Sequence, residues 1–94
     1  MNASGALASL KGLYLGENEI GDGGITAFAD ALSKGALPAL ERLSLEKNQI
    51  GDTGLSSFAD ALGKGALDKI ESIDLEGNPG NSAAVNNALR ERKK

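Results

Sequence analysis

The chain is 94 residues long, carries a net charge of -3 and has a sequence pI near 4.8. A hydrophobic fraction of 40% and a charged fraction of 24% indicate one small folded domain rather than a disordered segment. The absence of cysteine and histidine excludes disulfides, thiolate metal sites and the commonest catalytic base. We therefore expect a single domain over residues 1–94 that has no cofactor and no metal and is not an enzyme.

The same composition argues against nucleic-acid and membrane partners. The acidic balance gives no basic field, and 3% aromatic residues are too few for a base-stacking surface. No segment approaches the roughly 20 apolar residues that a membrane span needs. Residues 1–10 lack the basic and apolar regions of a signal peptide, so we expect an intracellular, cytoplasmic protein.

A repeat of thirty residues organises the chain. Asn18, Asn48 and Asn78 recur at this spacing, and a Gly-Ala-Leu triplet opens each unit. After a four-residue leader the chain divides into residues 5–34, 35–64 and 65–94. The first two units are identical at more than half of their positions, whereas the third resembles them mainly in its first half. Such a period is the signature of a solenoid.

The first half of each unit reads L-x-x-L-x-L-x-x-N, or its isoleucine variant, over residues 10–18, 40–48 and 70–78. Leu13 and Leu15 alternate with smaller or polar residues, which is the period of a strand with one buried face.

The second half of each unit has the period of a helix. In the first unit Ile25, Phe28, Ala29 and Leu32 fall on one helical face, and the second unit repeats the pattern. Polar residues stand just before these segments, so we predict that three of them cap helix N-termini: Asp22, Asp52 and Ser82. Glycines after the lysines that end the first two units, at positions 35 and 65, are typical of helix C-termini.

The stretch LGENEIGDGG, residues 15–24, combines acidic residues and glycines in a way that could bind a cation or a phosphate. It lacks the ligand spacing and final glutamate of an EF-hand, and the chain has no Walker loop. The next unit repeats the turn with fewer acidic residues, so we interpret the stretch as a turn and a helix cap.

These motifs resemble the leucine-rich repeat, and the long helical half with the I-G-D-x-G junction is similar to the ribonuclease-inhibitor-like subclass. The resemblance covers residues 7 to about 90. It implies an α/β fold, a short right-handed βα superhelix of three 30-residue units. Its parallel strands line the concave side and its helices the convex side.

The resemblance also assigns structural roles. The leucines, Ile20 and Phe28 of the first unit, with their counterparts in the second, should fill a narrow core. Asn18, Asn48 and Asn78 should form a ladder that satisfies the backbone of the turns. In the third unit Gly80, Ala88 and Arg92 replace large apolar residues, which is typical of a C-terminal cap. The basic end, residues 90–94, is either the solvated end of this helix or a nucleic-acid arm, and we favour the former.

Ligands in this fold meet the outward-pointing positions of the concave strands. We expect those positions to be Gly12 and Gly16 together with nine candidate binding residues: Tyr14, Glu17, Arg42, Ser44, Glu46, Lys47, Ser72, Asp74 and Glu76. Tyrosine and arginine are the residue types that most often anchor interfaces, and the acidic positions would favour a basic partner.

Three functions stay open from the sequence. The favoured one is a protein–protein interaction module whose partner binds the concave face. The resemblance also includes a Ran GTPase-activating protein, so regulation of a small GTPase through Arg42 is an alternative. The third is a structural or assembly role, in which open N-terminal faces pair.

Overall fold

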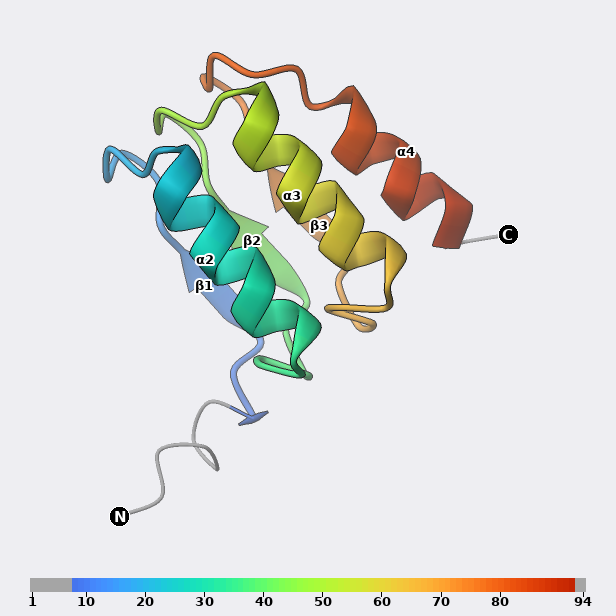
Figure 1. The fold of residues 1–94 in the computed structure, drawn as a ribbon. Helices are drawn as coiled ribbons and strands as arrows, with labels where there is room; N and C mark the ends of the chain where they lie inside the picture. The colour runs from blue at the N-terminus through green and yellow to red at the C-terminus, as the bar shows by residue number, and fades with distance from the viewer. Residues whose placement is uncertain (1–7, 93–94) are drawn as a thin grey trace.

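The computed structural model describes residues 8–92 of the chain, which alternate between strands and helices. The elements, with the labels of Figure 1, are β1 (Gly12–Tyr14), α2 (Asp22–Ser33), β2 (Arg42–Ser44), α3 (Asp52–Gly63), β3 (Ser72–Asp74) and α4 (Ala83–Arg92). The strands form one parallel sheet in the order β1-β2-β3, and the helices lie side by side over one face of it (Figure 1). None of the helices in this part of the chain has the length and apolar character needed to cross a membrane.

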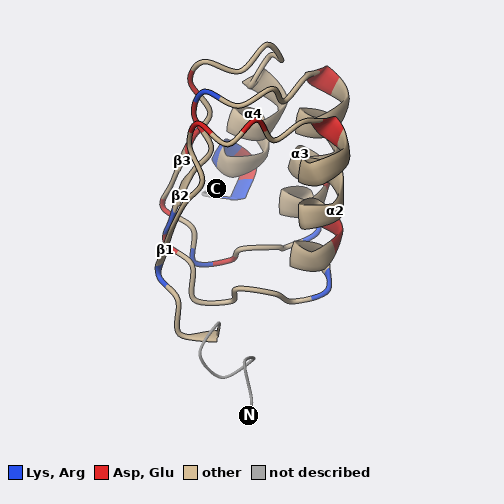
Figure 2. Cartoon of the chain, turned by 90° about the vertical axis from the view of Figure 1, so that its left-hand side faces the viewer, with Lys and Arg blue, Asp and Glu red and all other residues tan. Residues whose placement is uncertain are grey.

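The thirty-residue period sets the register of the sheet. Leu13 pairs with Leu43, and Leu43 pairs with Ile73, so equivalent positions of the three units stand side by side. These three side chains face the helices, whereas the residues before and after them in each strand face the other side of the sheet, because neighbouring residues of a strand point to opposite faces. The core therefore lies between the sheet and the helices, as the two-layer view of Figure 2 shows.

Each of the first two helices ends in a Schellman motif. After α2, the N–H of Gly35 donates to the carbonyl of Leu32 and the N–H of Ala36 donates to the carbonyl of Ala31. Gly35 has φ of 100°, a left-handed conformation that a side chain disfavours. Gly65 repeats this geometry after α3 with φ of 98°. Glycine at these positions thus turns the chain from each helix toward the next strand.

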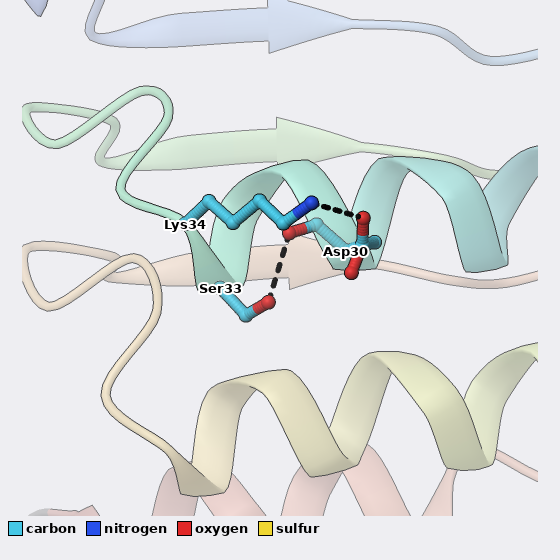
Figure 3. A network of polar contacts seen from close by, with 3 residues as sticks. All are labelled: Asp30, Ser33 and Lys34. Atoms are coloured by element: carbon cyan, nitrogen blue, oxygen red, sulfur yellow. Dashed lines mark hydrogen bonds and ion pairs between the residues drawn. The ribbon is translucent and has the colours of Figure 1, made fainter.

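A small polar network marks the end of α2 on the outer, convex side. Lys34 forms an ion pair with Asp30 at 3.1 Å, and the Ser33 hydroxyl donates to the Asp30 main-chain carbonyl (Figure 3). Lys64 and Asp60 repeat the ion pair at 3.4 Å on α3. Both pairs are largely exposed, so each contributes at most a few tenths of a kcal/mol.

The predicted N-caps are wrong for Asp22 and Asp52. Each is the first residue inside its helix, and the caps are Gly21 and Gly51, whose extended backbones carry no capping side chain. Ser82 does lie just before α4, where its carbonyl accepts from the Asn86 N–H. Sequence reasoning assigned each aspartate to its own helix because it considered only local partners.

The aspartates act across units instead. Asp22 Oδ1 accepts the N–H of Gly51 at 2.6 Å and that of Gly54 at 3.0 Å, both at the start of α3. Asp52 Oδ1 accepts the N–H of Asn81 at 2.8 Å in the third unit. The Asp22 carboxylate therefore satisfies free N–H groups at the beginning of the next unit's helix, where the helix dipole also favours a negative charge, whereas Asp52 binds the segment just before α4.

The asparagines form a ladder through the turns that follow the strands. Asn48 is 5% exposed, and its Oδ1 accepts the N–H groups of Asn18 and Ile20, both at 2.9 Å. Its Nδ2 donates to the carbonyls of Leu15 and Leu45. Asn78 makes most of the equivalent bonds with the second unit, since its Oδ1 accepts the Ile50 N–H and its Nδ2 donates to the carbonyls of Leu45 and Leu75. One amide thus replaces several strand hydrogen bonds where the chain leaves the sheet.

Burial rises from the first unit to the second. Phe58 is fully buried, whereas its equivalent Phe28 is only partly buried, although the two rings stack at 6.5 Å. Leu43 is likewise buried and its equivalent Leu13 is partly exposed. Within residues 8–92, the first unit has a neighbouring unit on one side only.

The third unit closes the opposite end by a different route. Arg92, where the earlier units have leucine, donates to the carbonyls of Ala66 and Leu67 at 2.7 and 2.6 Å. The described part of the basic end is therefore partly a structural cap of the unit's opening loop, and not only a solvated helix terminus. Residues 93 and 94 lie outside the described part.

Candidate functional site

The concave face is the side of the sheet that points away from the helices. The register aligns its side chains in rows, with Gly12 beside Arg42 and Ser72, and Tyr14 beside Ser44 and Asp74. A third row continues beyond the strands with residues 16, 46 and 76, because the Glu17 N–H still donates to Glu46 and the Lys47 N–H to Glu76. The structure therefore brings seven of the nine candidate residues into or beside these rows.

Tyr14 is the large hydrophobic residue that stands out of this face, with 68% of its surface exposed. Its ring lies back over Gly12, since a Cβ on Gly12 would come within 2.9 Å of the Tyr14 hydroxyl oxygen. Glycine at position 12 thus lets the ring lie along the strand and present one side to solvent. An exposed, preordered tyrosine of this kind is well suited to anchor a partner.

Glu46 is held by its neighbours on the same face. The Ser44 hydroxyl donates to a carboxylate oxygen of Glu46, and the carboxylate lies over Gly16, where no side chain obstructs it. This hydrogen bond, then a bond from the main chain and the charge of Lys47, hold the pKa of Glu46 below its ordinary value. These interactions favour the ionised form of the Glu46 carboxylate.

Charge is distributed unevenly over the concave face. Arg42 lies at the beginning of β2, whereas Glu46, Asp74 and Glu76 lie toward the strand ends. Figure 2 shows acidic residues along the loops between the strands and the helix starts. The face consequently presents Arg42 at one end and three acidic side chains toward the other, where Lys47 lies at the margin.

Glu17 and Lys47 lie in the turns that follow the strands, and their inclusion as strand positions is corrected. The strands are only three residues long, and these two residues have φ of 61° and 56°. Gly77 holds the same position in the third unit with φ of 82°. Both side chains are exposed, at the margin of the concave face.

A second surface feature lies at the N-terminal end of the sheet and helix layers. It is an open apolar recess of about 760 Å³, lined by Ala8, Leu10, Leu13, Phe28, Ala31, Lys34, Gly35, Ala36, Leu37 and Pro38. The sequence predicted an exposed flank of the first unit. It did not predict the second wall, which the loop of residues 34–38 supplies after the Schellman turn.

Within residues 8–92, no three side chains of the metal-binding types gather to hold an ion. Two smaller surface hollows are about 170 and 140 Å³, lined by the outer faces of α2 and α3 and by the loops after these helices. The arrangement offers surfaces for contact rather than an enclosed chemical site.

Parallel strands alternating with helices at a fixed period define an α/β repeat solenoid. The sequence profile of the leucine-rich repeat matches residues 6–29 and 37–59, together half of the chain. The chain belongs to the leucine-rich repeat family, whose domains generally mediate protein–protein interactions. Neither the curated proteins nor the solved structures that were searched include a match.

Proposed function

We propose that the chain is a protein-interaction module whose partner binds the concave face. The observation that supports this most directly is the 68% exposure of Tyr14 on a strand, next to the exposed Arg42 of the neighbouring strand. A large aromatic side chain in contact with water contributes little to folding, whereas burying it against a partner removes apolar surface from water.

The surroundings of Tyr14 favour close approach of another chain. Ser44 and Ser72 contribute small side chains to the face. Because Gly12 and Gly16 have no side chains, the Tyr14 ring and the Glu46 carboxylate lie over them and protrude little toward a partner. The acidic side chains at the strand ends would be opposed by basic groups of the partner, and Arg42 by an acidic group. The proposed partner is therefore a protein whose binding surface is basic where it meets the strand ends and acidic where it meets Arg42.

The test places a photoreactive tyrosine analogue at position 14 and maps the cross-linked protein by mass spectrometry. The captured protein is then titrated against the unlabelled chain and its Tyr14→Ala/Arg42→Ala variant. We expect at least a tenfold loss of affinity in the double variant, because aromatic and arginine anchors dominate interface energies. Thr53→Ala, on an exposed position of α3, is the matched control and should bind normally.

Equal binding by the double variant and the unlabelled chain would contradict the proposal for this face. Circular dichroism of each variant distinguishes loss of contact from loss of fold. None of these substitutions removes a buried side chain.

The subclass and location are part of the same proposal. The 12-residue length of α2 and α3 and the I-G-D-x-G junction support a ribonuclease-inhibitor-like repeat. The lack of cysteine supports an intracellular location, which imaging of the tagged chain in cells tests.

A further inference from the structure

We propose that the N-terminal end of the domain docks a strand–helix repeat unit of another polypeptide, one with aspartate at the position equivalent to Asp22. We define this end surface as the apolar recess, the free edge of β1 and the start of α2. It is separate from the concave face. The argument rests on the junction between the first two units, which shows what the same surface of the second unit binds.

Within the part of the chain that the structure describes, the main chain of β1 carries unpaired N–H and carbonyl groups at the same positions at which β2 uses them to pair with β1. In β2 the Arg42 N–H donates to Lys11 and the Ser44 carbonyl accepts from Leu15, so both point toward β1. Their equivalents in β1 are Gly12 and Tyr14, whose N–H and carbonyl groups therefore point to the free edge. A further parallel strand would satisfy these groups as β1 satisfies those of β2.

The start of α2 has main-chain N–H groups at the same positions as those that bind a carboxylate at the start of α3. There Asp22 accepts the N–H groups of Gly51 and Gly54. The equivalent residues at the start of α2 are Gly21 and Gly24, and in the described part of the chain their N–H groups meet no acceptor.

The glycines at these positions give an independent indication of the ligand. A Cβ on Gly54 would clash with Ile25 Cγ2 and come within 2.5 Å of Asp22 Oδ1, so glycine there allows both the close packing of α2 on α3 and the approach of the carboxylate. A Cβ on Gly24 would meet only Ile20, at 3.3 Å, and one on Gly21 would meet nothing within 4 Å. The first unit therefore has the same space beside the start of its helix, but no aspartate of the described residues occupies it. Glycine is unfavourable inside a helix, so its presence at position 24 is consistent with a need for this space.

Asn18 and the recess also correspond to features by which the second unit binds the first. The Asn48 amide donates across the junction to Leu15, whereas the Asn18 amide, within residues 8–92, donates to Gly16 in its own unit. Beside it, the recess presents Phe28 and Leu13 at the positions where Phe58 and Leu43 are covered by the first unit. A helix packed on α2, as α2 packs on α3, would cover this apolar surface.

A second copy of this chain does not supply the required unit. At its C-terminal end Ser82 replaces the aspartate, Ala88 replaces the phenylalanine, and Arg92 is engaged with Ala66 and Leu67. Two N-terminal ends would place one recess against another and leave both hollow. The proposed occupant is therefore a repeat unit of a different protein.

The experiment uses a probe that presents such a unit. The probe is residues 1–64 followed by a second copy of residues 35–64, with Ala31→Arg to block its own recess. Ala31 is exposed and lines the recess, so this change leaves the buried core intact. The probe is titrated into the natural chain and followed by sedimentation velocity and far-UV circular dichroism.

We expect a one-to-one complex, and a gain of helix on mixing if the free probe is only partly folded. Two matched variants should each weaken binding about tenfold or more: Asp52→Asn in the probe's second copy, and Gly24→Ala in the natural chain. The free Gly24→Ala chain should melt at the same or a higher temperature, since alanine favours a helix. Arg42→Ala should bind the probe normally, which separates this surface from the concave face.

The proposal is overturned if mixing gives neither a complex nor a gain of helix. It is equally overturned if both variants bind as tightly as their parents, because the carboxylate would then have no role. Dimerisation of the natural chain that Ala31→Arg abolishes would identify a second copy as the occupant and would also overturn it.

Discussion

The first and second units have nearly the same apolar pattern but different environments. Phe58, Leu43 and Ile50 are almost fully buried, whereas their equivalents in the first unit are partly exposed. The difference arises because, among the residues that the structure describes, the second unit has a neighbour on both sides and the first unit has one only on the side of the second. In a repeat fold, the sequence of a unit sets which side chains point inward, and the neighbouring units set how much water they exclude.

We expect the largest difference in stability between the two units for substitutions of their phenylalanines. Phe58→Ala should lower the free energy of unfolding by about 3–5 kcal/mol, because it removes a fully buried ring from a packed core. Phe28→Ala should cost less than half as much, since its ring is already partly in water. Urea unfolding followed by circular dichroism measures both. If Phe58→Ala does not fold, the milder Phe58→Leu and Phe28→Leu pair should keep the same order, and equal losses would refute the comparison.

The asparagine pair should show an intermediate effect. Asn48→Ala should cost about 3 kcal/mol, because it leaves buried main-chain donors and acceptors without partners. Asn18→Ala should change the stability by less than about 0.5 kcal/mol, since Asn18 is exposed and bonds within its own unit. Thermal unfolding of the two variants checks this order. Similar melting temperatures would mean that the ladder does not depend on position.

The aspartate pair should give the smallest difference. Asp22→Ala should cost about 1–2 kcal/mol, because it removes the acceptor of two N–H groups at the start of α3. Asp52→Ala should cost about 0.5 kcal/mol, since Asp52 is exposed and accepts one N–H. Amide hydrogen exchange at Gly51 and Gly54 should increase in the Asp22 variant only. Unchanged exchange there would show that the carboxylate does not cap α3.

The strand–helix alternation, the thirty-residue period and the apolar core positions could be read from the sequence, because each depends on the spacing of residues along the chain. The candidate surface could be read only in part. Alternation placed Tyr14 and Arg42 on one face, but it could not show that the Tyr14 ring lies over Gly12. It also extended the strands through Glu17 and Lys47, because a left-handed turn at a charged residue leaves no mark in the hydrophobic pattern.

The aspartates show most clearly the difference between what the sequence predicts and what the tertiary structure decides. A polar residue before a helix is usually its cap, so the sequence assigned Asp22 to α2. The structure places the carboxylate on α3, because the parallel stacking brings the start of the next helix within hydrogen-bond distance. The same stacking leaves the donors of Gly21 and Gly24 without such an acceptor in the described part of the chain.

The sequence by itself determined the period, the type of each element and the side of each element that faces the core. These follow from the spacing of leucines, asparagines and glycines, and therefore from the local geometry of strands, turns and helices. Only the tertiary structure decided which units are covered, which carboxylate caps which helix, and where the loop after α2 encloses an apolar recess. Those outcomes depend on contacts about thirty residues apart, which no local pattern encodes.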